Sequence, residues 1–171
     1  MRHLAGVVGP AVLTLALLVS TGAGAQPLTN PYGAPIGVET ARKLAHAAIA
    51  EGKKNGWTVA AAVVEPGGTL VYFERIDGTQ NGSSEVAVQK ARSAAAFKRP
   101  TKAFEDAVAG GRTAVLGLPG ALPLEGGVPL VIDGKIIGAL GVSGATSQQD
   151  GVCAKAGADA LGGAPAAPAQ K

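Results

Sequence analysis

The sequence predicts a mixed α/β fold of the α+β class, in which a mostly antiparallel sheet is flanked by helices. Two pairs of β-rich runs, each joined by a short turn, indicate two hairpins, and segments with helical periodicity stand before, between and after them. Consecutive hairpins separated by helices are typical of this class. The predicted order along the chain is α-β-β-α-α-loop-β-β-α.

The domain begins with a helix and a hairpin. Apolar and small residues recur at three- and four-residue spacing over 38–52, and the Lys-Lys-Asn-Gly sequence at 53–56 supplies the positive charge and the glycine that commonly end a helix. Runs rich in alanine and β-branched residues at 58–64 and 69–75 predict two strands. The Pro-Gly-Gly sequence at 66–68 joins them as a turn.

Two further helices follow this hairpin. Ser83 or Ser84 can cap a helix that runs to Phe97, and its inner ridge consists of alanines. Small residues on that ridge allow the helix to lie close to the sheet. Thr101 can cap a short third helix that ends at the glycine pair 110–111.

A long loop and a second hairpin come next. The segment 111–127 is rich in glycine, and irregular loops of this length are usually functional or interfacial. Residues 126–144 carry the strongest local signal, because Asp133-Gly134 separates two apolar runs and this dipeptide favours the type I′ turn of a hairpin. Both runs are apolar at nearly every position, which predicts strands that are covered on both faces and central in the sheet.

Three glycines interrupt the second of these runs at every third residue: Gly138, Gly141 and Gly144. They mark places where another backbone, a helix or a flat ligand can come close. Their spacing matches neither a dinucleotide-binding motif nor a P-loop. Packing within the sheet is therefore favoured over a nucleotide site.

A last helix is predicted over 147–161. Thr146 and Gln149 can form a capping box at its start, and its expected inner stripe includes Val152 and Cys153. Cys153 is the only cysteine of the chain, so it cannot form an internal disulfide. We interpret it as a buried, unreactive thiol rather than a ligand.

The composition divides the chain into four segments. Residues 1–25 combine a short basic start, an apolar run too short to span a bilayer comfortably and a small-residue cleavage motif, which together predict a cleaved signal peptide. We expect an extended leader at 26–36, a single domain at 37–161 and a disordered tail at 162–171. The mature protein is therefore expected in the periplasm or outside the cell, without a stable membrane anchor.

The charge balance argues against nucleic-acid binding. The chain has 15 Lys and Arg residues against 12 Asp and Glu residues, and the basic residues are scattered, with no aromatic side chains between them. Solvated helix faces are the simplest account of most of them. The group around the second predicted helix is either such a face or a set of partners for haem propionates or another anion; it comprises Lys90, Arg92, Lys98 and Arg99.

His46 is the only histidine outside the predicted signal peptide. With the apolar stripe of the first helix facing the core, a rotation of about 100° per residue places His46 on the outer face. It is therefore either a solvent-exposed histidine or a ligand to a metal or haem held at the surface or between subunits, where two copies could supply two axial ligands. Tyr72 and Tyr32 are the other candidate axial donors, and Tyr72 shares a strand face with Glu74.

Several stretches are distinctive enough to indicate a family: AAAVVEPGG at 60–68, KARSAAAF at 90–97 with RPT at 99–101, GGVPLVIDGKIIGALGVSG at 126–144, and Gln149-Asp150. Over about 37–161 the chain resembles the haem-binding GlcG/HbpS-like family. The resemblance implies a five-stranded antiparallel sheet flanked by helices, self-assembly into dimers or larger even-numbered oligomers, and haem binding in some members. Because the mode of haem ligation differs between members, the resemblance transfers no axial ligand to this chain.

The residues and the resemblance together predict an exported, oligomeric haem-binding protein. It would sense or store haem, or protect against redox damage, at a surface or intersubunit pocket. His46 is the leading candidate for the iron ligand, with Lys90 and Arg99 near the propionates. A binding role is favoured over catalysis.

Two alternatives remain open. One is a small-molecule enzyme or cofactor-dependent auxiliary whose pocket lies under the loop 111–127, with Asp150, Glu85 and Lys90 as its polar groups. The other is a ligand-free partner that modulates a membrane sensor. Titration with haem separates both from the first hypothesis.

Overall fold

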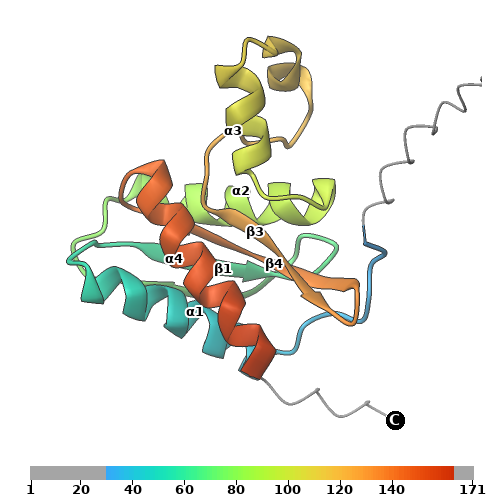
Figure 1. Ribbon diagram of the computed structural model, residues 1–171. Coiled ribbons are helices and arrows are strands. Elements are labelled where there is room, and N and C mark those ends of the chain that lie inside the picture. Colours follow the sequence, from blue (N-terminus) through green and yellow to red (C-terminus); the bar gives the residue numbers. More distant parts are fainter. Residues whose placement is uncertain (1–29, 164–171) are drawn as a thin grey trace, which may run out of the picture.

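The structure, a computed structural model, describes residues 30–163 (Figure 1). The predicted signal peptide at 1–25 lies outside the described residues, as do the first part of the leader and residues 164–171 of the tail. In chain order the elements are α1 (Val38–Lys54), β1 (Ala60–Val64), β2 (Leu70–Arg75), α2 (Gly82–Phe97), α3 (Lys102–Ala109), η1 (Thr113–Gly117), β3 (Gly127–Ile132), β4 (Lys135–Ser143), α4 (Ser147–Asp159) and η2 (Ala160–Gly163).

The four strands form one antiparallel sheet in the order β2-β1-β4-β3. The α+β class, with an antiparallel sheet flanked by helices, is confirmed. The described residues do not contain the fifth strand that the family resemblance implies. Tyr32 makes only a single parallel bridge to Ile136, and the neighbouring residues Pro31 and Pro35 carry no amide hydrogen with which to extend a ladder.

The predicted hairpin around Asp133-Gly134 is confirmed. Asp133 has φ 48° and Gly134 has φ 71°, as a type I′ turn requires. β4 is central, between β1 and β3, but β3 lies at the edge of the sheet, so its predicted central position is wrong. Pro129, in the middle of β3, is compatible with an edge strand. Proline has no backbone N–H, so it cannot take its full part in the hydrogen bonds of a central strand, which pairs with a neighbour on each side.

Helices cover both faces of the sheet. Ala61 and Val63 of β1 pack into the main core cluster with residues of α1 and α4, whereas the alternate residues Ala60 and Ala62 face the alanine ridge of α2. Figure 1 shows α1 and α4 on one side of the sheet and α2 on the other. The sheet therefore separates the surroundings of α1 from those of α2.

The glycines of β4 permit close approach of other backbone segments, as their spacing predicts. A Cβ atom at Gly141 would lie 2.0 Å from the carbonyl oxygen of Ala87 and 2.5 Å from the nitrogen of Ala91, both in α2. Gly138 and Gly144 likewise lie against the backbone of other segments. Protein backbone, not a ligand, accounts for all three glycines.

Of three predicted helix caps, one is present and two are not formed. The capping box of Thr146 and Gln149 is present at the start of α4. The predicted serine cap of α2 is wrong, because the helix already begins at Gly82 and Asn81 occupies the cap position without a side-chain cap bond. Thr101 does stand at the start of α3, but its hydroxyl accepts a hydrogen bond from the backbone nitrogen of Gly127 instead of capping the helix.

The inner face of α4 is rotated slightly from the predicted stripe. Cys153 is fully buried as expected, together with Ala154 and Gly157. Val152 is 48% exposed, so its predicted place in the core is wrong. Gly157 lies against the backbone of Leu44 in α1, and this close contact between the helices determines which side of α4 faces inward.

The segment between α2 and β3 forms a projection. Figure 1 shows α3 and η1 extending away from the sheet and its covering helices. The predicted loop 111–127 contains η1 and exposes Leu116 and Leu118. Within residues 30–163, no helix is both long and apolar enough to cross a membrane.

Candidate functional site

His46 lies on the outer face of α1, where the helical periodicity places it, and its side chain is 54% exposed. Two side chains of β2 meet its ring. The Nε2 atom of His46 lies 2.9 Å from a carboxylate oxygen of Glu74 and 3.1 Å from the hydroxyl oxygen of Tyr72. The structure thus brings two of the candidate axial donors, His46 and Tyr72, together with an acidic partner.

Glu74 and partial burial also affect the phenol of Tyr72. Desolvation raises the pKa of Tyr72, and the negative charge of Glu74 and its hydrogen bond with the phenol raise it further. The phenol therefore stays protonated at neutral pH, which makes Tyr72 a poorer anionic ligand than a free phenolate. Since a carboxylate hydrogen-bonded to one nitrogen of a histidine orients the ring, His46 can offer its other nitrogen to an external group.

Glu74 is a site residue that was not predicted from the sequence. The alternation within β2 does place Glu74 on the face of Tyr72, so the signal was present in the strand pattern. Its contact with His46 depends on how α1 packs against β2, which no local pattern gives. In the described part of the chain, no group of three or more His, Cys, Asp or Glu residues could hold a metal ion.

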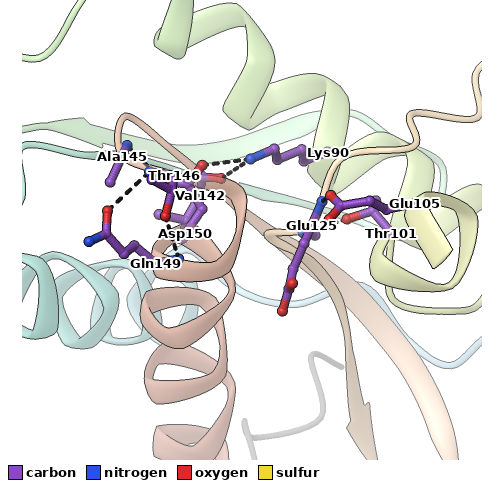
Figure 2. A network of polar contacts seen from close by, with 10 residues as sticks. Lys90, Thr101, Glu105, Glu125, Val142, Ala145, Thr146, Gln149 and Asp150 are labelled. Carbon is purple, nitrogen blue, oxygen red and sulfur yellow. Dashed lines mark hydrogen bonds and ion pairs between the residues drawn. The ribbon is translucent and has the colours of Figure 1, made fainter. Parts of the chain in front are cut away.

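Lys90 lies inside the molecule. Its Nζ atom donates to the carboxylate of Asp150 at 2.7 Å and to the carbonyl of Val142 at 3.0 Å, and its side chain is 2% exposed (Figure 2). The expectation of a solvated helix face is wrong for this residue. Lys90 stands three residues after Ala87 and four before Ala94 on the buried ridge of α2, so the periodicity could have shown its burial.

The other basic candidates lie on or near the end of α2. Arg99 is exposed, donates from Nε to the carbonyl of Phe97 at 3.1 Å and stacks over the ring of Phe104. Because α1 and α2 cover opposite faces of the sheet, the structure does not bring His46 together with Lys90 or Arg99 in one protomer.

The side chain of Tyr32 contacts the end of α2. Its hydroxyl donates to the carbonyl of Ala95 at 2.9 Å, and the ammonium of Lys98 lies 4.2 Å from the centre of its ring. These contacts use the phenol to fasten the leader to the end of α2. They leave Tyr32 with a structural role rather than that of a free axial donor.

Asp150 and Lys90, two polar groups of the alternative hypothesis, form a buried ion pair where β4 ends. Asp150 also accepts from the backbone nitrogen of Ala145 at 3.0 Å. Burial raises the pKa of Asp150, and the hydrogen bond and charge of Lys90 act in the opposite direction. The third group, Glu85, is exposed and pairs instead with Gln89 of its own helix. An open pocket adjoins this ion pair, and Leu124 of the long loop is one of its lining residues.

Residues 36–159 match the protein family described as haem degrading protein HbpS-like. The chain belongs to the HbpS-like family. This confirms the resemblance drawn from the sequence motifs, because the match covers almost all of the described domain.

Relatives and solved structures agree with the HbpS-like assignment. Protein GlcG of Escherichia coli (strain K12) is 45% identical over 106 residues, which cover 60% of this chain and 79% of GlcG. A crystallised double mutant of Streptomyces reticuli HbpS is 31% identical, with a TM-score of 0.69 over 89% of this chain and 99% of the other. The crystallised PduOC–haem complex is 28% identical, with a TM-score of 0.66 over 74% of this chain and 94% of PduOC.

Proposed function

We propose that this member of the HbpS-like family is an exported haem-binding protein that uses His46 as a ligand to the haem iron. The observation that carries the proposal is the exposed imidazole of His46, oriented by Glu74 on one ring nitrogen. Membership of the family and the likeness to the PduOC–haem complex support the choice of haem.

The residues around His46 suit a haem at the surface. Imidazole is a common ligand of haem iron, and His46 would supply it here, because the porphyrin brings its own nitrogen donors. When bound, haem supplies a redox-active iron. Arg42 and Lys43, one helical turn before His46, are exposed on the same side of α1 and can pair with propionates. Arg99 can contribute only from another protomer in this arrangement.

Assembly and location belong to the same proposal. An even-numbered homo-oligomer would let two His46 side chains approach one haem across a twofold axis. The proposed roles are haem sensing, storage or redox protection in the periplasm or outside the cell, with a membrane sensor as a candidate partner. Sequencing of the secreted protein tests export directly, since cleavage of the signal peptide should expose Gln26 as the first residue.

Haem titration of the purified mature protein tests the ligand. The wild type should give a saturable Soret shift, His46→Ala should lose it, and Glu74→Gln should weaken binding by about 10- to 100-fold because the ring is less well oriented. Lys155→Ala, an exposed change on α4, is the matched control and should behave as the wild type. An unchanged spectrum in His46→Ala would refute His46 as the ligand, and no Soret shift in the wild type would refute haem binding.

A further inference from the structure

The projection formed by residues 102–125 exposes large apolar side chains. Leu116 is 61% exposed, more than any other large apolar residue within residues 30–163, and Leu118 is 43% exposed. The stretch 116–120 is exposed without interruption, on a part of the chain that extends away from the sheet and its covering helices (Figure 1). Because soluble proteins rarely leave contiguous apolar surface uncovered, this stretch has the character of an interface.

The projection has little core of its own. Phe104 is the only buried residue of α3, and Val115 is the only buried residue of η1. The leucines of the projection therefore face solvent in a single protomer. Cover from a second molecule would remove their apolar surface from water, which is favourable.

Hydrogen bonds hold the exposed segment in a defined shape. The backbone nitrogens of Leu118 and Ala121 donate to the carbonyls of Val115 and Leu118, both at 3.1 Å. The nitrogen of Leu122 donates to the hydroxyl of Ser93 in α2 at 3.0 Å, which ties the returning chain to the body of the domain. Binding to such a preformed surface costs less conformational entropy than binding to a loop that must first be ordered.

The charges around this surface suit a second copy of the same chain. The stretch 113–124 contains no charged residue, Arg112 stands directly before it and Glu125 directly after it. In a twofold interface each residue near the axis meets its own copy, so a charge there would repel itself. Two such stretches that run in opposite directions bring the positive start of one near the negative end of the other.

We propose that the projection is a self-association surface, on which the stretch 113–124 packs against the same stretch of a second copy around a twofold axis. The length of the projection is comparable with one side of a standard interface, which has roughly 20–30 residues. The proposal specifies one surface of the homo-oligomer proposed above. It involves neither haem nor His46, which lies on α1.

A lipid surface is the less suitable occupant. The stretch 113–124 contains neither tryptophan nor tyrosine, the residues that favour the boundary of a membrane. The charged residues of the projection comprise three acids and two bases, namely Glu105, Asp106, Glu125, Lys102 and Arg112. This balance gives no attraction to an anionic membrane.

Analytical ultracentrifugation of the mature protein without haem tests the proposal. The wild type should associate as its concentration rises, and Leu116→Glu should weaken this association by about 30-fold or more, because it places a charge in an apolar interface. Val38→Glu is the matched control, since Val38 is 53% exposed at the start of α1 and should associate as the wild type does. A wild type that stays monomeric, or equal association in Leu116→Glu, would overturn the proposal.

The charge at the start of the stretch gives a second test. Arg112→Glu should weaken association by about tenfold at low salt, because it faces Glu125 of the second copy, and the difference from the wild type should shrink at high salt. Equal association of the two proteins at low salt would overturn the antiparallel arrangement.

Cross-linking locates the contact. In a Cys153→Ala background, Leu116→Cys should form a covalent dimer with a short bismaleimide, whereas Val38→Cys should stay monomeric under the same treatment. No cross-link at position 116, or binding of the wild type to phosphatidylcholine vesicles in place of self-association, would contradict a second copy as the occupant. The same association should persist in His46→Ala, so a failure of haem binding and a failure of this interface give different results.

Discussion

The Nζ atom of Lys90 lies 2.7 Å from the carboxylate of Asp150, and both side chains are almost fully buried. The pair connects α2 with α4 past the end of β4 (Figure 2). Burial of two charges is costly unless further hydrogen bonds satisfy them. Here the carbonyl of Val142 and the nitrogen of Ala145 supply such bonds. The pair therefore fixes the relative position of two helices that lie on opposite faces of the sheet.

Removal of one partner should be strongly destabilising. Lys90→Met leaves the carboxylate of Asp150 buried without its counter-charge, and we expect the free energy of unfolding to fall by about 3–5 kcal/mol. Urea denaturation followed by circular dichroism measures this change. The double variant Lys90→Met/Asp150→Leu removes both charges and should recover much of the loss.

The exposed ion pair of α3 provides the control. Lys102 and Asp106 lie 2.6 Å apart, but both side chains are more than half exposed. Lys102→Met should therefore change the free energy of unfolding by less than about 1 kcal/mol. Similar losses in Lys90→Met and Lys102→Met would contradict the importance of burial.

Local signals predicted the elements of the fold, whereas the arrangement of the strands depended on distant contacts. The Asp133-Gly134 turn and the capping box of Thr146 each depend on a few adjacent residues, and both are present. The apolar run of β3 indicated coverage on both faces, but helices provide such coverage at an edge as well as at the centre. Pro129 was the local sign that β3 is an edge strand.

The same distinction applies to the candidate sites. Periodicity within α1 correctly placed His46 on the outer face, but its contacts with Tyr72 and Glu74 require the packing of α1 on β2. Periodicity within α2 could have shown that position 90 is buried, but a buried lysine is unexpected without a partner. That partner, Asp150, is 60 residues away, and no spacing rule joins them.

Gly141 should not tolerate a side chain. A Cβ atom at this position would overlap backbone atoms of Ala87 and Ala91, so Gly141→Ala must push α2 away from the sheet. We expect a loss of about 3 kcal/mol or more in the free energy of unfolding, measured by urea denaturation. Gly82→Ala is the control, since a Cβ atom there meets nothing within 4 Å. A mild effect at position 141 would mean that α2 lies farther from β4.

Thr101 and Gly127 are joined by two hydrogen bonds. The nitrogen of Gly127 donates to the Thr101 hydroxyl at 2.9 Å, and the nitrogen of Thr101 donates to the Gly127 carbonyl at 2.9 Å. Thr101→Val keeps the side-chain volume but leaves the Gly127 N–H unpaired, which should cost about 1–3 kcal/mol. Hydrogen exchange at the Gly127 amide should accelerate in Thr101→Val and stay slow in Thr101→Ser. Equal exchange in both variants would rule out the hydroxyl as the acceptor.

Cys153 should make the stability of the protein depend on alkaline pH. Burial, with smaller contributions from the negative charges of Asp150 and Glu51, raises the pKa of this thiol from 9.0 to about 11. Between these values the folded state keeps a proton that the unfolded state loses, so this contribution to stability is complete below about pH 9 and disappears as the pH rises through about 11.

The expected loss from this thiol is about 2–3 kcal/mol in the free energy of unfolding. Urea denaturation from pH 8 to pH 11 should show a shallower decline for Cys153→Ala than for the wild type, whatever the variant loses at neutral pH by its smaller side chain. At pH 8 the native thiol should also resist a disulfide reagent that modifies it at once in urea, because it is both protonated and fully buried. Parallel declines in the two proteins, together with rapid modification of the native state, would show that Cys153 titrates as an exposed thiol.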